Sequence, residues 1–125
     1  MKRVLKISSL LVFVLALVAL AGCMPKDPEK AKAKLEKAGY SVTVDGTISP
    51  KVLNAIDGIN GAKSVVSASK DDEHVSAVYF ESAKLAKESY KAMKEQAANN
   101  GEKTEAKLSG KWIYYGTEAG VKAFK

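Results

Sequence analysis

The chain has 125 residues, 46% of them hydrophobic and 27% charged, with twenty Lys and Arg residues against fourteen Asp and Glu. This length fits one domain and excludes a multidomain enzyme, and the charged fraction argues against an unstructured polar chain. A single Cys and a single His exclude an internal disulfide and a multi-histidine metal site. The formal net charge of +6 suggests a polyanion-binding protein until its distribution is considered.

The first residues have the pattern of a secretory signal peptide. Residues 1–6 carry three basic side chains and no acidic one, and residues 7–21 are apolar apart from two serines. A basic start, an apolar stretch and an exit of small residues are typical of an export signal that is removed. The apolar stretch is short for a membrane-spanning helix, which needs about 20 residues. We therefore expect residues 1–22 to be cleaved from the mature protein.

The small residues at the end of this segment precede the single cysteine, in the order Leu20-Ala21-Gly22-Cys23. This motif resembles the lipobox of bacterial lipoproteins. The resemblance implies that the Cys23 sulfur receives a diacylglycerol, that the bond before Cys23 is cut, and that the new N-terminus is acylated. Two acyl chains suffice for stable anchoring, and we expect no cofactor besides this covalent lipid. The alternative is an uncleaved anchor helix in which Cys23 is an ordinary thiol.

Cleavage before Cys23 changes the charge of the mature protein. It removes 22 of 125 residues, with three bases and no acids, which leaves 103 residues with seventeen lysines against fourteen acids. No arginine remains, and arginine is the residue that makes bidentate contacts to phosphate and guanine. The lysines and acids are interspersed, as on solvated helix faces. We therefore expect no nucleic-acid partner, with weak attraction to an anionic membrane as the remaining alternative.

Residues 23–27 form a short lipidated tether, and the first structural elements follow at once. Asp27-Pro28 is a typical helix start, and Gly39 is placed to end that helix. The alternation of apolar and polar residues over 40–45 predicts a half-buried strand. Ser49-Pro50 repeats the helix start, and the apolar stripe of that helix, which stops at Gly58, consists of Val52, Leu53 and Ile56.

The middle of the chain predicts a hairpin and a long helix. Residues 62–69 and 75–81 are rich in strand-forming residues, and the polar run Lys70-Asp71-Asp72-Glu73 between them predicts the turn. Residues 82–98 form the clearest helix, because apolar side chains recur at spacings of three and four: Ala83, Ala86, Tyr90, Met93 and Ala97.

A second hairpin and a short helix complete the chain. Residues 103–108 and 111–116 pair across Ser109-Gly110, and Thr117 caps a helix that ends near Phe124. The predicted order is α-β-α-β-β-α-β-β-α. Hairpin-linked strands with intervening helices favour an α+β fold, a two-layer domain in which an antiparallel sheet of four to five strands packs against helices. We expect residues 28–125 to form this single globular domain.

Two stretches of the mature part are similar to small lipoproteins of Gram-positive bacteria. They are residues 29–40, which read EKAKAKLEKAGY, and residues 110–116, which read GKWIYYG. The resemblance implies no catalytic activity for particular residues.

The polar residues offer little catalytic chemistry. A nucleophilic mechanism would need His74, the only His, which lies beside the acidic run, and the sequence contains no nucleophile-elbow motif such as Gly-x-Ser-x-Gly. We expect His74 to be an exposed strand-end residue. Asp71, Asp72 and Glu73 are consecutive and lack the alternating calcium spacing, so they predict an acidic hairpin tip. We predict no catalytic residues and no metal site, although carboxylate chemistry by Glu81, Glu88 or Glu118 stays open.

The aromatic residues are the most informative cluster. Trp112 and Tyr114 lie on one face of the last strand, Ile113 and Tyr115 lie on the other, and Tyr79 belongs to a neighbouring strand. If one face of the sheet is open, Trp112, Tyr114 and Tyr79 form a candidate surface for a partner. The alternative is that a small domain uses most of its aromatic residues in the core.

Together these patterns predict a lipid-anchored lipoprotein on the extracytoplasmic face of the cell membrane. Its domain is expected to be a non-catalytic binding module for an envelope protein, peptide or glycan. One alternative is an accessory or inhibitory subunit of an envelope enzyme or transporter, and another is a small hydrolase that uses carboxylates.

Overall fold

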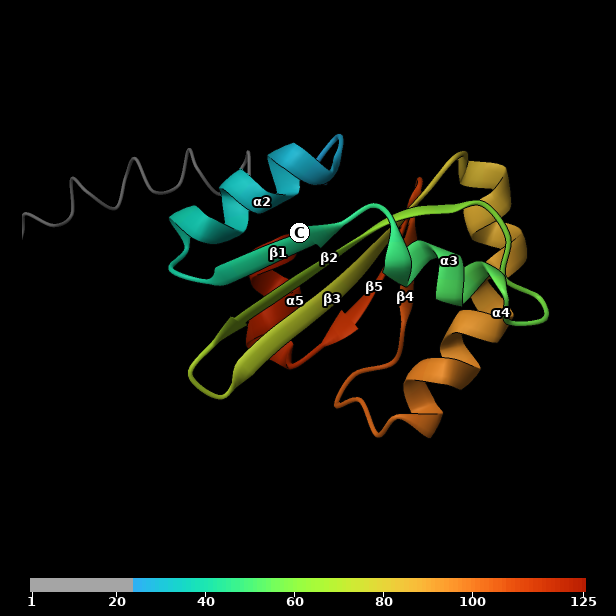
Figure 1. Cartoon of the computed structure of the whole chain (residues 1–125). Helices are drawn as coiled ribbons and strands as arrows, with labels where there is room; N and C mark the ends of the chain where they lie inside the picture. The colour runs from blue at the N-terminus through green and yellow to red at the C-terminus, as the bar shows by residue number, and fades with distance from the viewer. Residues whose placement is uncertain (1–23) are drawn as a thin grey trace, which may run out of the picture.

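The structure is a computed structural model that describes residues 24–125. The signal segment, the lipobox and Cys23 lie outside the described residues. The elements follow one another in the predicted order (Figure 1). They are α2 (Pro28–Lys37), β1 (Ser41–Asp45), α3 (Ile48–Asn54), β2 (Ala62–Lys70), β3 (Glu73–Phe80), α4 (Ala83–Asn99), β4 (Lys107–Ser109), β5 (Trp112–Gly116) and α5 (Glu118–Phe124).

Local signals explain where α2 begins and what it buries. The Asp27 carboxylate accepts a hydrogen bond of 2.8 Å from the Lys30 backbone N–H, and Pro28 occupies the first turn. The Asp27 carboxylate satisfies one of the unpaired N–H groups that every helix start presents, and Pro28 has no N–H to satisfy. Ala31 and Leu35, spaced four residues apart, are fully buried against the sheet. The predicted start of this helix at Asp27-Pro28 is confirmed.

The start of α3 differs from the prediction. The Asp45 carboxylate, at the end of β1, accepts hydrogen bonds from the backbone N–H groups of Thr47, Ile48 and Ser49 and from the Ser49 hydroxyl. These bonds lower the pKa of Asp45 from 3.8 to about 2. Asp45 therefore caps the helix, which begins before Ser49-Pro50. Val52, expected in the apolar stripe, is 60% exposed.

The strands form one five-stranded antiparallel sheet in the order β1-β2-β3-β5-β4. Asp71 and Asp72 form the predicted turn between β2 and β3, and Asp71 adopts a left-handed φ of 56°. β4 is shorter than expected, because residues 103–106 form a loop and only Lys107–Ser109 pair with β5.

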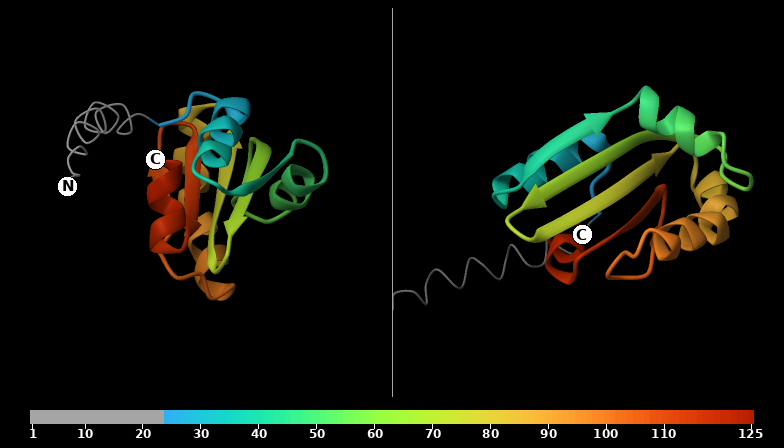
Figure 2. Two further views of the ribbon diagram at one scale, coloured as in Figure 1. Left: turned by 90° about the vertical axis from the view of Figure 1, so that its left-hand side faces the viewer. Right: turned by 60° about the horizontal axis from the view of Figure 1, so that its bottom comes forward.

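Helices lie on both sides of the sheet (Figure 2). α2 and α5 cover one face, which we call the aromatic face because Trp112, Tyr114 and Phe124 pack there. α4 covers β3, β5 and β4 on the opposite face, and α3 contacts β2 and β1. The α+β class and the antiparallel sheet are confirmed. The domain has two layers where β1 and β2 extend beyond α3 and α4, because only α2 covers the sheet there. Around β3 and β5 it has three layers, because α5 and α4 lie on opposite faces of the sheet.

The opposite face combines an apolar core with an uncovered area. Ile113, Val78 and Phe80 meet Met93 of α4 in a fully buried cluster. Beyond the reach of α4, this face is uncovered at the front left of Figure 1. The exposed residues there are small and hydroxyl-bearing: Ser41, Thr43, Ser67 and Ser69.

Candidate functional site

The two residues expected to lead an exposed binding surface are buried. Trp112 is 2% exposed and Tyr114 is 4% exposed, while Tyr79 is half-buried at their edge. The prediction that Trp112 and Tyr114 are available to a partner is therefore wrong. The physical reason is that α5 folds back over β5 and covers both rings.

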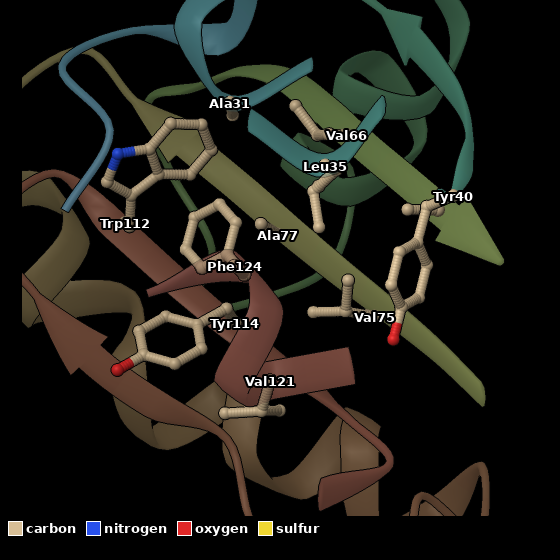
Figure 3. Packing of buried hydrophobic residues seen from close by; sticks show 11 residues of the cluster. Ala31, Leu35, Tyr40, Val66, Val75, Ala77, Trp112, Tyr114, Val121 and Phe124 are labelled. Atoms are coloured by element: carbon tan, nitrogen blue, oxygen red, sulfur yellow. The ribbon is translucent and has the colours of Figure 1, made fainter. Parts of the chain in front are cut away.

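The covered rings form a tightly packed aromatic cluster (Figure 3). The Phe124 ring lies 5.0 Å from the Trp112 ring and 5.1 Å from the Tyr114 ring, between ring centroids, and Tyr79 lies 4.9 Å from Trp112. The Trp112–Phe124 contact is edge-to-face at 79°. Tilted and edge-to-face pairs are the preferred aromatic geometries and add stability beyond the buried area. The cluster is therefore a structural core.

α5 is held on the sheet by Thr117 and Gly120. The Thr117 hydroxyl accepts hydrogen bonds from the backbone N–H groups of His74 and Gly120, and the Thr117 N–H donates to the His74 carbonyl. A Cβ atom at Gly120 would lie 2.1 Å from that carbonyl oxygen. Only glycine allows the helix to approach β3 this closely, so the residue type at 120 determines how α5 covers the aromatic rings.

The polar atoms of the aromatic cluster hold the start of the described chain. The Trp112 indole N–H donates to the Pro25 carbonyl at 2.8 Å, and the Tyr79 hydroxyl donates to the Lys26 carbonyl at 3.3 Å. Met24 packs against the same cluster. Figure 3 shows the N-terminal ribbon passing the indole nitrogen. We call Met24–Lys26 the docked segment.

The docked segment changes the predicted boundary of the domain. Residues 23–27 were expected to be a short tether outside a domain of residues 28–125. Instead, the described part of that tether belongs to the folded unit, which extends back to Met24. No local pattern could have revealed this, because Pro25 and Trp112 are 87 residues apart in the sequence.

Burial also affects the ionisation of Tyr114. Desolvation raises the pKa of its phenol, and the charge of Tyr90 raises the pKa further. The phenol therefore stays neutral at physiological pH, which is consistent with a core residue and gives no activated nucleophile.

His74 has a partner that the sequence did not indicate. Its Nε2 atom lies 2.8 Å from Glu102 Oε1, and the side chains are 40% and 17% exposed. This pair links β3 to the loop after α4. Ser69 is the cross-strand neighbour of His74, but within residues 24–125 no hydroxyl is hydrogen-bonded to the imidazole. Across the same residues, no three His, Cys, Asp or Glu side chains are grouped so that they could hold a metal ion.

A groove lies beside α5. It has a volume of about 550 Å³ and is lined by Lys107, Lys122 and Lys125, with Glu118 and Thr104. Three cations face one carboxylate, so the groove is suited to an anionic group. Glu88, another carboxylate considered for catalysis, instead lies 3.9 Å from Lys84 on α4.

No protein family, curated protein or solved structure matches the chain. Between Met24 and Lys125, none of the helices combines the length and the apolar character needed to cross a bilayer. Cys23, Leu20, Ala21 and Gly22 lie outside the described residues, so the lipobox stays a sequence-based prediction.

Proposed function

We propose that this protein is a lipoprotein anchored through Cys23 at the extracytoplasmic face of the cell membrane, with a small non-catalytic interaction domain. The lipobox pattern Leu20-Ala21-Gly22-Cys23 supports the anchor. The observation that carries the proposal from anchor to function is the docked segment, which begins one residue after Cys23. An anchor at that position places the folded domain directly at the bilayer surface.

This arrangement differs from a domain on a flexible stalk. Only one peptide unit separates the lipidated residue from Met24, which packs on the aromatic cluster. Pro25 and Lys26 are held by hydrogen bonds to Trp112 and Tyr79. The domain therefore presents a defined side to the membrane, as suits a protein that binds a neighbour in the envelope.

The proposed lipidation of Cys23 can be tested by measuring the intact mass of the protein. The full chain is expressed in a bacterium with lipoprotein-processing enzymes, extracted in detergent and measured beside the Cys23→Ser variant. The expected wild-type product lacks residues 1–22 and carries diacylglycerol on Cys23, whereas the variant carries no acyl mass.

A matched control tests whether the loss of acyl mass in Cys23→Ser is due to the missing sulfur. Lys26→Gln alters the same segment but leaves the motif and the Lys26 carbonyl in place, and its product is expected to carry the same lipid as the wild type. A wild-type product without acyl mass, or acylation that persists in Cys23→Ser, would sink the proposal.

A further inference from the structure

Two independent features of the molecule coincide on the aromatic face. The first is the exit point of the chain toward Cys23. The docked segment lies over Trp112, whose side chain projects to the side covered by α2 and α5. Met24 of the docked segment packs with residues of α2 and α5 in one core cluster on this face of the sheet. A lipid anchor at Cys23 therefore leaves the domain from this side.

The second feature is the distribution of side-chain charge. Residues 24–37 and 117–125, which form the docked segment, α2 and α5, contain seven lysines and four acids. Residues 38–116, which form the sheet, α3 and α4, contain ten lysines and ten acids. The whole side-chain excess of three positive charges in the described chain thus belongs to the layer on the aromatic face. Five of the seven lysines are exposed: Lys26, Lys30, Lys37, Lys122 and Lys125.

The groove beside α5 concentrates this charge. Lys122 belongs to α5 and Lys125 directly follows it. Lys107 pairs with Tyr114 across β4 and β5, so its side chain projects to the same face. Glu118 is the single acid in the lining and Thr104 adds a hydroxyl. Lysines are well suited to phosphate because each offers three donors on a compact positive charge.

We infer that the layer formed by the docked segment, α2 and α5 lies against the anionic lipid surface, with the α5 groove receiving a phosphate headgroup. This inference rests on the proposed anchoring through Cys23. It adds which surface of the domain faces the membrane and which class of lipid that surface binds. Each lysine near an anionic bilayer strengthens association about fivefold. The uncovered hydroxyl-bearing area of the opposite face then points away from the bilayer, where a neighbour can reach it.

The experiment measures binding of residues 24–125, without signal or lipid, to sedimented vesicles. This piece contains the whole sheet, both cores and the docked segment. The vesicles consist of phosphatidylcholine with phosphatidylglycerol, or of phosphatidylcholine alone. Lys107, Lys122 and Lys125 are changed together to Gln, and the matched control changes Lys84, Lys87 and Lys91 of α4, so both variants lose the same charge.

The inference predicts binding to the anionic vesicles only. The groove variant loses about 10- to 100-fold in partitioning, as three lysines at about fivefold each allow, and the α4 variant loses less than about threefold. The binding weakens as salt rises past about 0.1 M. Circular dichroism and thermal unfolding of the unchanged domain and of both variants check that all three proteins are folded.

Equal losses in the two variants, equal binding to neutral vesicles, or no binding by the unchanged domain would overturn the inference. None of these outcomes depends on Cys23. If they occur while intact mass finds lipid on Cys23, the anchor stands and the membrane-facing surface is wrong. If vesicle binding behaves as expected and no lipid is found, the surface stands and the anchor is wrong.

Discussion

The two faces of the sheet are built from different chemistry. The aromatic face buries rings with polar atoms, and those atoms hold the backbone of Pro25 and Lys26. The opposite face buries Val78, Phe80 and Ile113 of β3 and β5 against α4, and part of it stays uncovered. A buried indole N–H usually finds a hydrogen-bond acceptor, and here the backbone carbonyl of Pro25 supplies it. The polar atoms of the aromatic face therefore tie the docked segment to the core of the domain.

The strongest test of this difference removes one large side chain from each face. Phe124→Ala is expected to lower the free energy of unfolding by about 3–5 kcal/mol, and Met93→Ala by about 2–5 kcal/mol, measured by urea unfolding. Only Phe124→Ala should also speed hydrogen exchange in residues 24–30, because Phe124 supports the Trp112 ring. Equal exchange in the two variants would mean that the docked segment is independent of the aromatic cluster.

A smaller effect is expected where α5 approaches β3. Gly120→Ala forces a Cβ against the His74 carbonyl, and overpacking of this kind costs about 1–3 kcal/mol. Gly46→Ala is the matched control, because its Cβ would meet the Ser64 hydroxyl at an ordinary 3.5 Å, and its effect should stay within about 0.5 kcal/mol. Comparable thermal unfolding of both variants would contradict the close approach of α5.

The hydrogen bond to the docked segment can be removed while an aromatic ring is kept at position 112. Trp112→Phe eliminates the indole N–H, which is expected to lower the free energy of unfolding by about 1 kcal/mol in addition to the packing lost with the smaller ring, with faster hydrogen exchange at residues 24–27. Tyr114→Phe removes a hydroxyl that has no hydrogen-bond partner within residues 24–125, so it should leave that exchange unchanged. Slow exchange in Trp112→Phe would show that Met24 packing and the Tyr79 hydrogen bond hold the segment without the indole N–H.

The smallest effect is expected at α3, which packs on the opposite face of the sheet. Asp45 has a folded-state pKa of about 2 against an ordinary 3.8. Its contribution to stability is therefore complete above about pH 4 and is lost as the pH falls through 2. Asp45→Asn should lower the melting temperature slightly at neutral pH, and the gap to the wild type should close between pH 4 and 2. A difference in melting temperature that stays constant over that range would show that groups other than the Asp45 carboxylate cap α3.

Local chemistry explains why much of the fold was predictable. The Asp27 cap, the Asp71-Asp72 turn and the Thr117 cap each depend on residues within a few positions, so the sequence indicates them directly. The periodicity of residues 82–98 likewise predicted α4, although Ser89 is buried in place of Ala83 because its hydroxyl bonds to the Asn60 backbone. The start of α3 was missed because its cap, Asp45, belongs to the preceding strand.

The sequence by itself determined the order of elements, the antiparallel α+β class and the two sets of side chains on β5. Only the tertiary structure decided what covers each set. Strand alternation separates Trp112 and Tyr114 from Ile113 and Tyr115, but both sets are apolar enough to be buried, and a strand buried on both faces gives no signal of which face is open. The lysine excess that seemed diffuse along the chain likewise gathers on one layer only because α2 and α5, at opposite ends of the sequence, pack on the same face.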